Sequence, residues 1–338
     1  MFGNKNLLKR VIVVALIGML TLALAGCGGQ EGKPNEDEVE YPNKPISAIS
    51  PWSAGGSSDT AFRTFLNYMS QEMGGVDINV TNMTGGNGSI GWSAAAKAEP
   101  DGYTLALLTF DILTVEAQKL APVSYRDFDI INMFTKQTCV LIVHGDSPWN
   151  TLEDFLEASR KAKAEGKKLE IGIAGEAGLW HQAGVVMEEA TGTEGAYKYI
   201  PFTGSADQLA AMLGKHLDAM ITTTTASRPH LKEGTLRMLA VMSDKRSEEF
   251  PETPTFEELG YDVKYDSWRA VVVPKGTPEP VLEILREAGK KAFDNPEFQE
   301  WAKESDIGAM YLDHEDTIKY IENQYPVVEG VMKKFGLL

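Results

Sequence analysis

The chain has 338 residues, and its 48 acidic side chains outnumber 32 basic ones, which gives a formal charge of −16 at pH 7. This balance argues against nucleic acid as a partner, because phosphate backbones are held mainly by Lys and Arg. An anionic ligand would gain nothing from the overall field and would need local donors. The length is sufficient for two α/β domains of ordinary size.

The N-terminus has the pattern of an export signal. Three basic residues among the first ten precede an uncharged apolar run over residues 11–25. That run is shorter than the roughly 20 residues that span a bilayer, but it has the length of a signal-peptide core. It ends in Leu-Ala-Gly-Cys, which resembles the bacterial lipobox. We therefore expect residues 1–26 to be a lipoprotein signal peptide and Cys27 to be lipidated, so that the exported protein is anchored to the outer face of the cytoplasmic membrane.

Residues 27–44 are polar and rich in Gly and Pro, which favours a flexible tether. If Cys27 carries lipid, Cys139 is the only cysteine left, so no internal disulfide can form. Cleavage before Cys27 leaves 312 of the 338 residues and a formal charge of −19, because the signal contains three basic and no acidic side chains. The core alone must then stabilise the fold.

Strand-like and helix-like segments alternate through the rest of the chain, which is typical of parallel α/β architecture. The helical patterns include one after residue 180 that Gly192 is expected to cap. The run of threonines at 222–225 is interpreted as a strand end. Strands are expected at 46–51, 77–82, 103–110, 138–144, 169–175, 197–202, 218–225, 236–243 and 267–274, and helices dominate from Pro278 onward.

The segment SAGGSSD, residues 53–59, joins a strand to an amphipathic helix. Glycines allow a close backbone approach, and a helix N-terminus offers free N–H groups and a positive dipole end to an anion. Ser57, Ser58 and Asp59 are also ordinary helix-capping residues, so capping alone is an alternative. The lysine of a phosphate-binding P-loop is missing.

A second glycine loop contains Gly86, Gly88 and Gly91 as G-x-G-x-x-G, with Asp111 20 residues further on. Locally this meets the dinucleotide fingerprint. The export signal, the first glycine loop one βα unit earlier and the lack of an obvious acid/base pair argue against a nucleotide. A plain tight turn is another alternative, but we favour a non-nucleotide anion held by the amides of both loops.

Other motifs give little. The five histidines form no H-E-x-x-H, and neither C-x-x-C nor G-x-S-x-G occurs, so we expect no metal, no cofactor and no enzymatic activity. His181 lies in the first turn of an expected helix and fits a packing or capping role as well as a ligand contact. Trp52, Trp180 and Phe202 lie near the loops, and each on its own is interpreted as a core residue.

Several ordered segments carry a family resemblance. They include YPNKPISAISPWSAGGSSDTAFR, NMTGGNGSIGWSAAAKAEPDGYTLAL, IGIAGEAGLWHQAGVVMEEATG and YIPFTGSADQLAAMLGKHLDAM. From Tyr41 to the C-terminus the chain resembles the substrate-binding receptors of tripartite tricarboxylate transporters. The resemblance implies a two-lobed, periplasmic-binding-protein-like (type II) α/β fold with a ligand cleft between lobes. Lobe 1 would comprise 45–144 and 268–338, and lobe 2 would comprise 145–267.

In that family a carboxylate is held by amides and small side chains of the two glycine loops while loops of the other lobe close over it. Bridging waters often take part. Carried onto this chain, the resemblance assigns Ala54, Gly55, Gly56, Ser57, Ser58 and Asp59 to the first loop and Gly85, Gly86, Asn87, Gly88 and Ser89 to the second. It adds Thr109 and Asp111 from lobe 1, and Gly178, Trp180, His181, Thr203, Gly204 and Ser205 from lobe 2. Trp52 and Leu179-Trp180 depart from the smaller residues usual there, so they would narrow the cleft or stack on an aromatic acid.

The resemblance implies a monomer that captures a small carboxylate, either a di- or tricarboxylate, an amino acid or an aromatic acid. It also implies delivery of that ligand to the membrane subunits of the transporter. A receptor that reports to a signalling kinase would have the same cleft. An exported dinucleotide-binding enzyme is the third possibility, and Asp59 with His181 is the only acid/base pair that the sequence offers for it.

Overall fold

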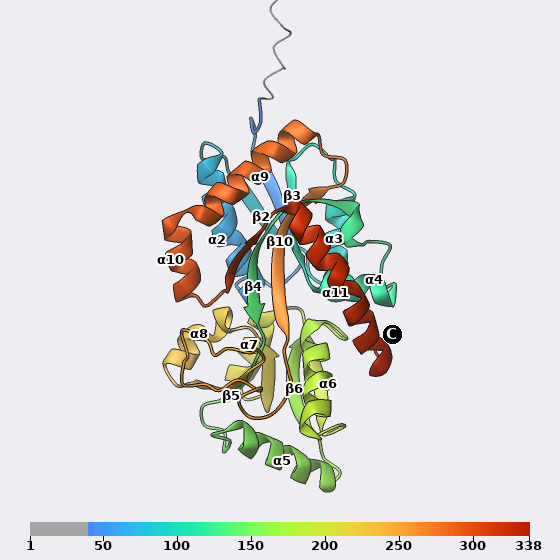
Figure 1. The fold of residues 1–338 in the computed structure, drawn as a ribbon, viewed down its shortest axis with the longest axis vertical. Helices are drawn as coiled ribbons and strands as arrows, with labels where there is room; N and C mark the ends of the chain where they lie inside the picture. Colours follow the sequence, from blue (N-terminus) through green and yellow to red (C-terminus); the bar gives the residue numbers. More distant parts are fainter. Residues whose placement is uncertain (1–39) are drawn as a thin grey trace, which may run out of the picture. The chain divides into compact units, whose positions relative to one another are not determined.

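Two β-sheets, each covered by helices, make up residues 40–338, which the computed structural model describes (Figure 1). The expected signal peptide 1–26, Cys27 and residues 28–39 of the expected tether lie outside the described residues. Within residues 40–338, no helix combines the length and the apolar character that crossing a bilayer requires.

The first lobe, drawn in the upper part of Figure 1, contains a six-stranded sheet in the order β11-β4-β10-β3-β1-β2. Its strands are β1 (Ile46–Ser50), β2 (Ile78–Asn82), β3 (Thr104–Thr109), β4 (Phe128–Thr138), β10 (Asp266–Pro274) and β11 (Ala309–Leu312). Its helices are α2 (Ser57–Glu72), α3 (Ser89–Ala96), α4 (Asp111–Gln118), α9 (Glu279–Asp294), α10 (Pro296–Glu304) and α11 (His314–Lys334), with short 3₁₀ turns at Gly86–Gly88 and Tyr125–Asp127.

The second lobe contains a five-stranded sheet in the order β7-β6-β8-β5-β9. Its strands are β5 (Val140–His144), β6 (Leu169–Ala174), β7 (Tyr197–Phe202), β8 (Ala219–Thr222) and β9 (Leu236–Val241). Its helices are α5 (Leu152–Ala164), α6 (Leu179–Thr191), α7 (Ser205–Leu213) and α8 (Thr224–Lys232). Gly192 caps α6 in the left-handed conformation, with φ 65°, as predicted.

Both sheets are mixed, which corrects the expectation of parallel architecture. In the first, β1 is parallel to β2 and β3, but β10 is antiparallel to β3 and β4. In the second, β6 is parallel to β7 and β8, but β5 is antiparallel to β8 and β9. β5 and β10 are the first strands after each passage from one lobe to the other, and each enters its sheet against the direction of the βαβ units.

The chain crosses between the lobes at Cys139 and at Tyr265. The Cys139 N–H donates to the Tyr265 carbonyl at 2.9 Å, so the two crossings are hydrogen-bonded to each other. Since β5 pairs in the second sheet, the first crossing comes before residue 140, and the expected lobe boundary after residue 144 is wrong for this strand. The threonine run is also corrected, because β8 ends at Thr222 and Thr224 begins α8.

The first lobe is held by a core in which helices of both halves of the chain meet. Phe65 of α2 stacks on Phe134 of β4 with ring centroids 4.4 Å apart. Phe298 of α10 packs edge-on against the Phe65 ring, with centroids 5.2 Å apart. All three are fully buried. Since full burial of such a side chain stabilises the fold by about 1.5–3 kcal/mol, this cluster fixes α2, and with it the first glycine loop, against the sheet.

Candidate functional site

The N-terminal ends of four helices meet between the two sheets: α2 and α4 from the first lobe, α6 and α7 from the second. Ser57 of α2 donates its N–H to Ser205 Oγ of α7 at 2.6 Å. Leu179 of α6 donates its N–H to Asp111 Oδ1 of α4 at 2.8 Å. Each helix follows a strand directly, so the carboxyl ends of the strands place these turns at the junction of the lobes, where α/β folds bind ligands.

An inner cavity lies at this junction. Its free space is about 20 Å³, room for about one water molecule. The residues that line it are Trp52, Ser58, Thr109, Asp111, Ala174, Leu179, Trp180, Gly204, Ser205 and Ser267. Both lobes contribute to the wall, and the lobes must separate before a carboxylic acid can enter.

An outer cavity of about 400 Å³ adjoins it, and Trp52 lines both. Its walls are Trp52, Gly85, Gly86, Asn87, Gly88, Gly175, Glu176, Pro201, Phe202, Thr203 and Asp207. The second glycine loop therefore faces the outer cavity, while Ser58 of the first faces the inner one. The structure places the two loops at neighbouring cavities instead of around one common point.

The first loop is organised by Asp59, whose side chain is 1% exposed. Its carboxylate accepts hydrogen bonds from Gly55 N–H at 2.9 Å, Arg63 Nε at 2.8 Å and Asn82 Nδ2 at 2.7 Å. Gly55 has φ 74°, a left-handed conformation that glycine adopts without strain. Asp59 lines neither cavity, so it serves the loop's own geometry.

Gly56 and Gly204 allow the two lobes to approach closely. A Cβ atom on Gly56 would lie 2.7 Å from Ser205 Oγ, and one on Gly204 would lie 2.3 Å from Ser53 Oγ. Ser57 adds a second hydrogen bond between the lobes, because its hydroxyl oxygen accepts the N–H of Ala226 in α8 at 3.2 Å. The N-terminus of α2 is thus bonded to the second lobe on two sides.

Asp111 supplies a carboxylate from the chain itself to the N-terminus of α6. Besides the bond from Leu179, it accepts one from Thr109 Oγ1 at 3.3 Å. Burial raises the Asp111 pKa to about 6, although these hydrogen bonds and the charge of Arg269 act to lower it. A Cβ on Gly178 would lie 2.6 Å from Asp111 Oδ1, so only glycine fits beside this contact. One helix N-terminus that the sequence offered to a ligand is therefore already occupied.

His181 lines neither cavity. Its Nδ1 accepts the Ala177 N–H at 2.9 Å, and its ring lies 4.5 Å from that of Tyr199. Burial lowers the His181 pKa, which keeps the ring in the neutral form that can accept this bond. His181 therefore has the packing or capping role that the sequence allowed as the alternative to a ligand contact.

Asn87 reaches from the second glycine loop into the other lobe. A Cβ on Gly175 would lie 1.8 Å from Asn87 Oδ1, so the amide sits directly against the Gly175 backbone. Both polar atoms of this side chain are buried, and within residues 40–338 neither has a hydrogen-bond partner. Thr203, across the outer cavity, bonds to Asp207.

Of the expected site residues, the structure brings together two groups. Ser58, Thr109, Asp111, Trp180, Gly204 and Ser205 line the inner cavity, and Gly85, Gly86, Asn87, Gly88 and Thr203 line the outer one. The others, Ala54, Gly55, Gly56, Ser57, Asp59, Ser89, Gly178 and His181, line neither. Sequence reasoning missed Ser267 and, behind the wall, Arg269. The one sequence feature that could have identified Arg269 is that it is a single arginine within the mostly apolar, buried strand SWRAVVVP.

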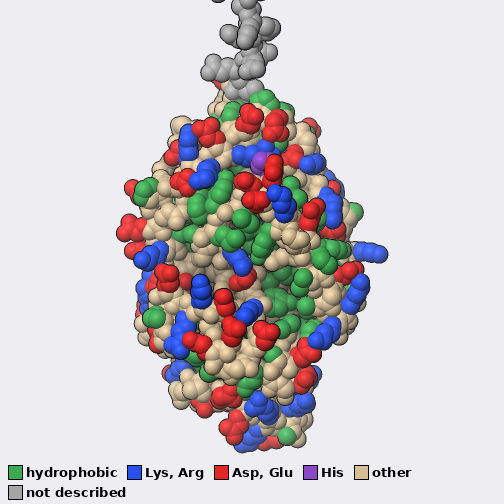
Figure 2. All heavy atoms as spheres, in the orientation of Figure 1, with side chains coloured by type: hydrophobic (Ala, Val, Ile, Leu, Met, Phe, Trp, Pro, Cys, Tyr) green, Lys and Arg blue, Asp and Glu red, His purple; other side chains and the backbone are tan. Residues whose placement is uncertain are grey.

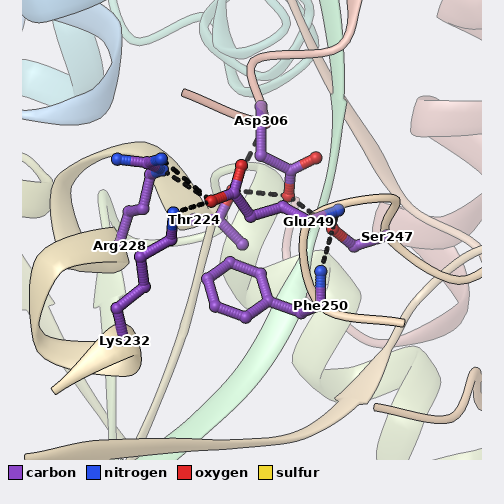
Figure 3. A network of polar contacts seen from close by, with 7 residues as sticks. All are labelled: Thr224, Arg228, Lys232, Ser247, Glu249, Phe250 and Asp306. Atoms are coloured by element: carbon purple, nitrogen blue, oxygen red, sulfur yellow. Dashed lines mark hydrogen bonds and ion pairs between the residues drawn. The ribbon is translucent and has the colours of Figure 1, made fainter. Parts of the chain in front are cut away.

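A polar network bridges the lobes away from the cavities, as Figure 3 shows. Asp306, between α10 and β11, accepts hydrogen bonds from Ser247 Oγ at 2.9 Å and Thr224 Oγ1 at 3.1 Å in the second lobe. Next to it, Glu249 forms ion pairs with Arg228 and Lys232. Burial raises the Asp306 pKa. The network ties the lobes together without using any residue expected at the site.

A larger groove of about 1120 Å³ contains none of the expected site residues. Its walls carry both signs of charge, including Lys136, Lys245, Asp244 and Asp266. Acidic and basic side chains are likewise interspersed over the face drawn in Figure 2. Within residues 40–338, no group of three or more His, Cys, Asp or Glu side chains is placed to hold a metal ion.

Two lobes joined by two crossings, with a cavity at the carboxyl ends of their strands, define the class of periplasmic binding proteins. A solved structure described as a periplasmic transporter has a TM-score of 0.80 at 31% identity, covering 87% of this chain and 98% of that one. The periplasmic binding protein BugD has a TM-score of 0.80 at 29% identity, covering 88% and 99%. A protein of the gbd 5′ region of Cupriavidus necator is 28% identical over 336 residues, which is 99% of this chain and 98% of that protein.

The sequence profile described as "Tripartite tricarboxylate transporter family receptor" matches residues 61–337, and the chain belongs to this family. The family and the fold are those of exported solute-binding receptors, as the resemblance predicted.

Proposed function

We propose that the protein captures a small carboxylate between its lobes, outside the cytoplasmic membrane, and delivers it to the membrane subunits of a tripartite tricarboxylate transporter. The observation that carries this proposal is the inner cavity, where helix N-termini and hydroxyl groups of both lobes converge. The proposal includes no catalytic step and no cofactor.

The donors at the cavity suit a carboxylate. The first N–H groups of a helix have no partner within the helix, and the helix dipole adds a positive end. Ser58 and Ser205, at the starts of α2 and α7, add hydroxyl groups. Hydrogen bonds from such groups to a carboxylate are charge-assisted and stronger than neutral ones.

Two structures of the same fold hold dicarboxylates: MatC of Rhodopseudomonas palustris contains malate, and a second R. palustris protein contains adipate. Their TM-scores are 0.76 and 0.82, but at 22% and 23% identity they support only the likeness of fold. The ligand of the present chain is proposed from its own cavity.

Closure of the lobes would be the signal that the membrane subunits recognise. A ligand that contacts both lobes favours the closed arrangement, because the open one offers only part of those contacts. The small volume of the inner cavity and the hydrogen bonds across the lobes describe a closed arrangement. Opening would require the Ser57–Ser205 and Asp111–Leu179 contacts to break.

The protein would work as a monomer held by lipid on Cys27, the first residue of the tether 27–44. A Cys27→Ala variant tests the anchor: it should lose the incorporation of labelled palmitate that we expect of the wild type. Palmitate incorporation that persists in that variant would contradict a lipid anchor on Cys27.

A thermal-shift screen tests capture directly. The chain from residue 28 onward would be exposed to malate, citrate, adipate, aspartate and benzoate. A ligand at 100 times its Kd stabilises the folded state by about 2.7 kcal/mol, so at least one acid should raise the Tm with a saturable dose response. Trp52 and Trp180 line the cavity, so the same acid should change tryptophan fluorescence. No saturable response from any of the five acids would count against the proposal.

A further inference from the structure

Arg269 lies in β10 and is 0% exposed. Its guanidinium donates to three neutral oxygens: Ser58 Oγ at 3.0 Å, Thr135 Oγ1 at 3.2 Å and Gln137 Oε1 at 3.3 Å. Within residues 40–338 it forms no ion pair, and its Nη2 is buried without a partner. A buried cation of this kind is costly unless another charge compensates it.

Two acidic groups influence Arg269 through space, the Cys139 thiol and the Asp111 carboxyl group. Burial raises the pKa of the Cys139 thiol well above its usual value, so only Asp111 brings a negative charge at neutral pH. Burial lowers the Arg269 pKa to about 10, so the side chain remains charged at neutral pH. Both Asp111 oxygens are already engaged, by Leu179 N–H and Thr109 Oγ1. The positive charge of Arg269 is therefore not matched by an ion-pair partner in the described part of the chain.

The position of Arg269 connects this charge to the inner cavity. Ser58 forms part of the cavity wall, and its oxygen accepts the Arg269 Nε–H. A hydroxyl that accepts from a cation still has its own proton to donate, and such a donor is polarised by the cation behind it. Ser267, two residues earlier on the same face of β10, also lines the cavity.

We propose that Arg269 is the counter-charge of the bound ligand. The Ser58 hydroxyl donates a hydrogen bond to a ligand carboxylate, and Arg269 supplies the positive charge directly behind that hydroxyl. This inference rests on the proposed function. It adds that the electrostatic attraction for the ligand comes from one residue outside both glycine loops.

The same arrangement limits how much charge the inner cavity accepts. No Lys, Arg or His lines it, and Asp111 adds a carboxyl group to its wall. Trp52, Trp180 and Leu179 supply apolar surface. Once the lobes have separated enough to admit a ligand, this lining suits a single carboxylate on an uncharged body, and a second acidic group of the ligand would have to extend toward the outer cavity.

The test is isothermal titration with whichever of malate, citrate, adipate, aspartate and benzoate gives the largest thermal shift. Wild type would be compared with Arg269→Met, Arg269→Lys and Ser58→Ala. Losing a charge-assisted interaction should weaken binding of the Met variant by about tenfold or more, and the Ser58→Ala variant should weaken too. The Lys variant should recover part of the loss. Arg269 is proposed to act through Ser58, so the two substitutions remove the same interaction. The loss of affinity in the Arg269→Met/Ser58→Ala double variant should therefore be smaller than the two single losses multiplied together.

Stability separates this role from a structural one. Met removes a desolvated cation, so the ligand-free Tm of Arg269→Met should stay the same or rise, while affinity falls. Arg126→Met is the control, since Arg126 is a surface residue paired with Glu116 and its loss changes net charge equally. It should bind as wild type does.

Three results would overturn the proposal. Wild-type affinity in Arg269→Met would refute it and leave the proposed function intact. A Tm and an affinity that fall together in that variant and are not recovered by Lys would make the arginine structural. Failure of wild type to bind any of the five acids would overturn the proposed function, and this inference with it.

Discussion

Asp111 shows at the scale of one residue how the chain pairs its own acid with a helix N-terminus. The carboxyl group belongs to a buried residue, bonds across the lobes to Leu179 and lines the inner cavity. Burial disfavours its charged form and raises its pKa to about 6, above the ordinary 3.8. The contact is therefore sensitive to pH in a defined direction.

Replacement by Asn tests this direction. Between pH 3.8 and 6 the folded wild type keeps a proton that the unfolded chain releases, so this residue's contribution to stability is present at low pH and is lost as pH rises through 6. From pH 4 to pH 7, the unfolding free energy of wild type should fall relative to Asp111→Asn by about 2 kcal/mol. Urea titrations at both pH values measure it. A difference that stays constant, or that grows with pH, would contradict the assigned pKa.

The residues also show where sequence reasoning reaches its limit. The expected site residues followed from the two loops and the family resemblance, and eleven of the nineteen line the two cavities. Asp59 and His181 have the chemistry of a site, but their partners Arg63 and Ala177 are local and give them structural roles. Arg269 reaches Ser58 only through the pairing of β10 with β3 and β4, which no local pattern reveals.

At the scale of elements, function depends on how closely two helix N-termini approach. Gly204 precedes α7 and faces Ser53, where an added Cβ would lie 2.3 Å from the hydroxyl and 2.8 Å from the backbone nitrogen. Its φ of 167° is extended backbone that any residue adopts, so alanine introduces no local strain. A substitution there obstructs the contact between lobes, because the added Cβ would lie against Ser53.

Gly204→Ala should therefore hinder closure without unfolding either lobe. Ligand affinity should fall by about tenfold or more, since a clash in the closed state costs at least about 1–3 kcal/mol. The ligand-free Tm should stay close to that of wild type. Titration calorimetry and thermal melting give the two values, and unchanged affinity would show that this approach is not needed for binding.

Gly330 provides the matched control. It is an exposed glycine inside α11, and a Cβ there meets nothing within 4 Å. Gly330→Ala should stabilise the fold by about 0.5–1 kcal/mol through helix propensity and leave ligand affinity unchanged.

Most elements followed from periodicity, but four did not: α4, β4, α8 and β11. Residues 111–137 contain α4 and the long strand β4, whose apolar pattern is interrupted by Asn132 and Gln137. Both side chains are buried, because β4 lies inside the sheet and Gln137 bonds to Thr224 and to the Asp306 carbonyl. The partners of Gln137 are distant in the sequence, so this polar residue is read locally as loop. The same limit displaced the lobe boundary, since strand pairing decides that β5 belongs to the second sheet.

At the scale of the whole molecule, separate groups of hydrogen bonds join the two lobes. Besides the bonds at the helix N-termini, Asp306 with Thr224 and Ser247 forms a separate bridge (Figure 3). Polar contacts exchange readily with water, so their net contribution to closure is about 0.5–1.5 kcal/mol each. A ligand with modest differential affinity can then shift the balance between open and closed states.

Small-angle scattering measures this shift. The radius of gyration of the ligand-free protein should be larger than that of the protein saturated with its carboxylate, because binding draws both lobes onto one ligand. Gly204→Ala should show a smaller change at saturation. Identical scattering with and without ligand would contradict closure on binding.

The most direct measurement of the central claim is a crystal structure of the chain from residue 28 onward with the acid selected by the thermal-shift screen. We predict a ligand carboxylate within hydrogen-bonding distance of Ser58 and of the N-terminus of α2 or α7, with Arg269 behind it. A ligand found in the groove lined by Lys136 and Asp244, with the inner cavity unchanged, would contradict the account.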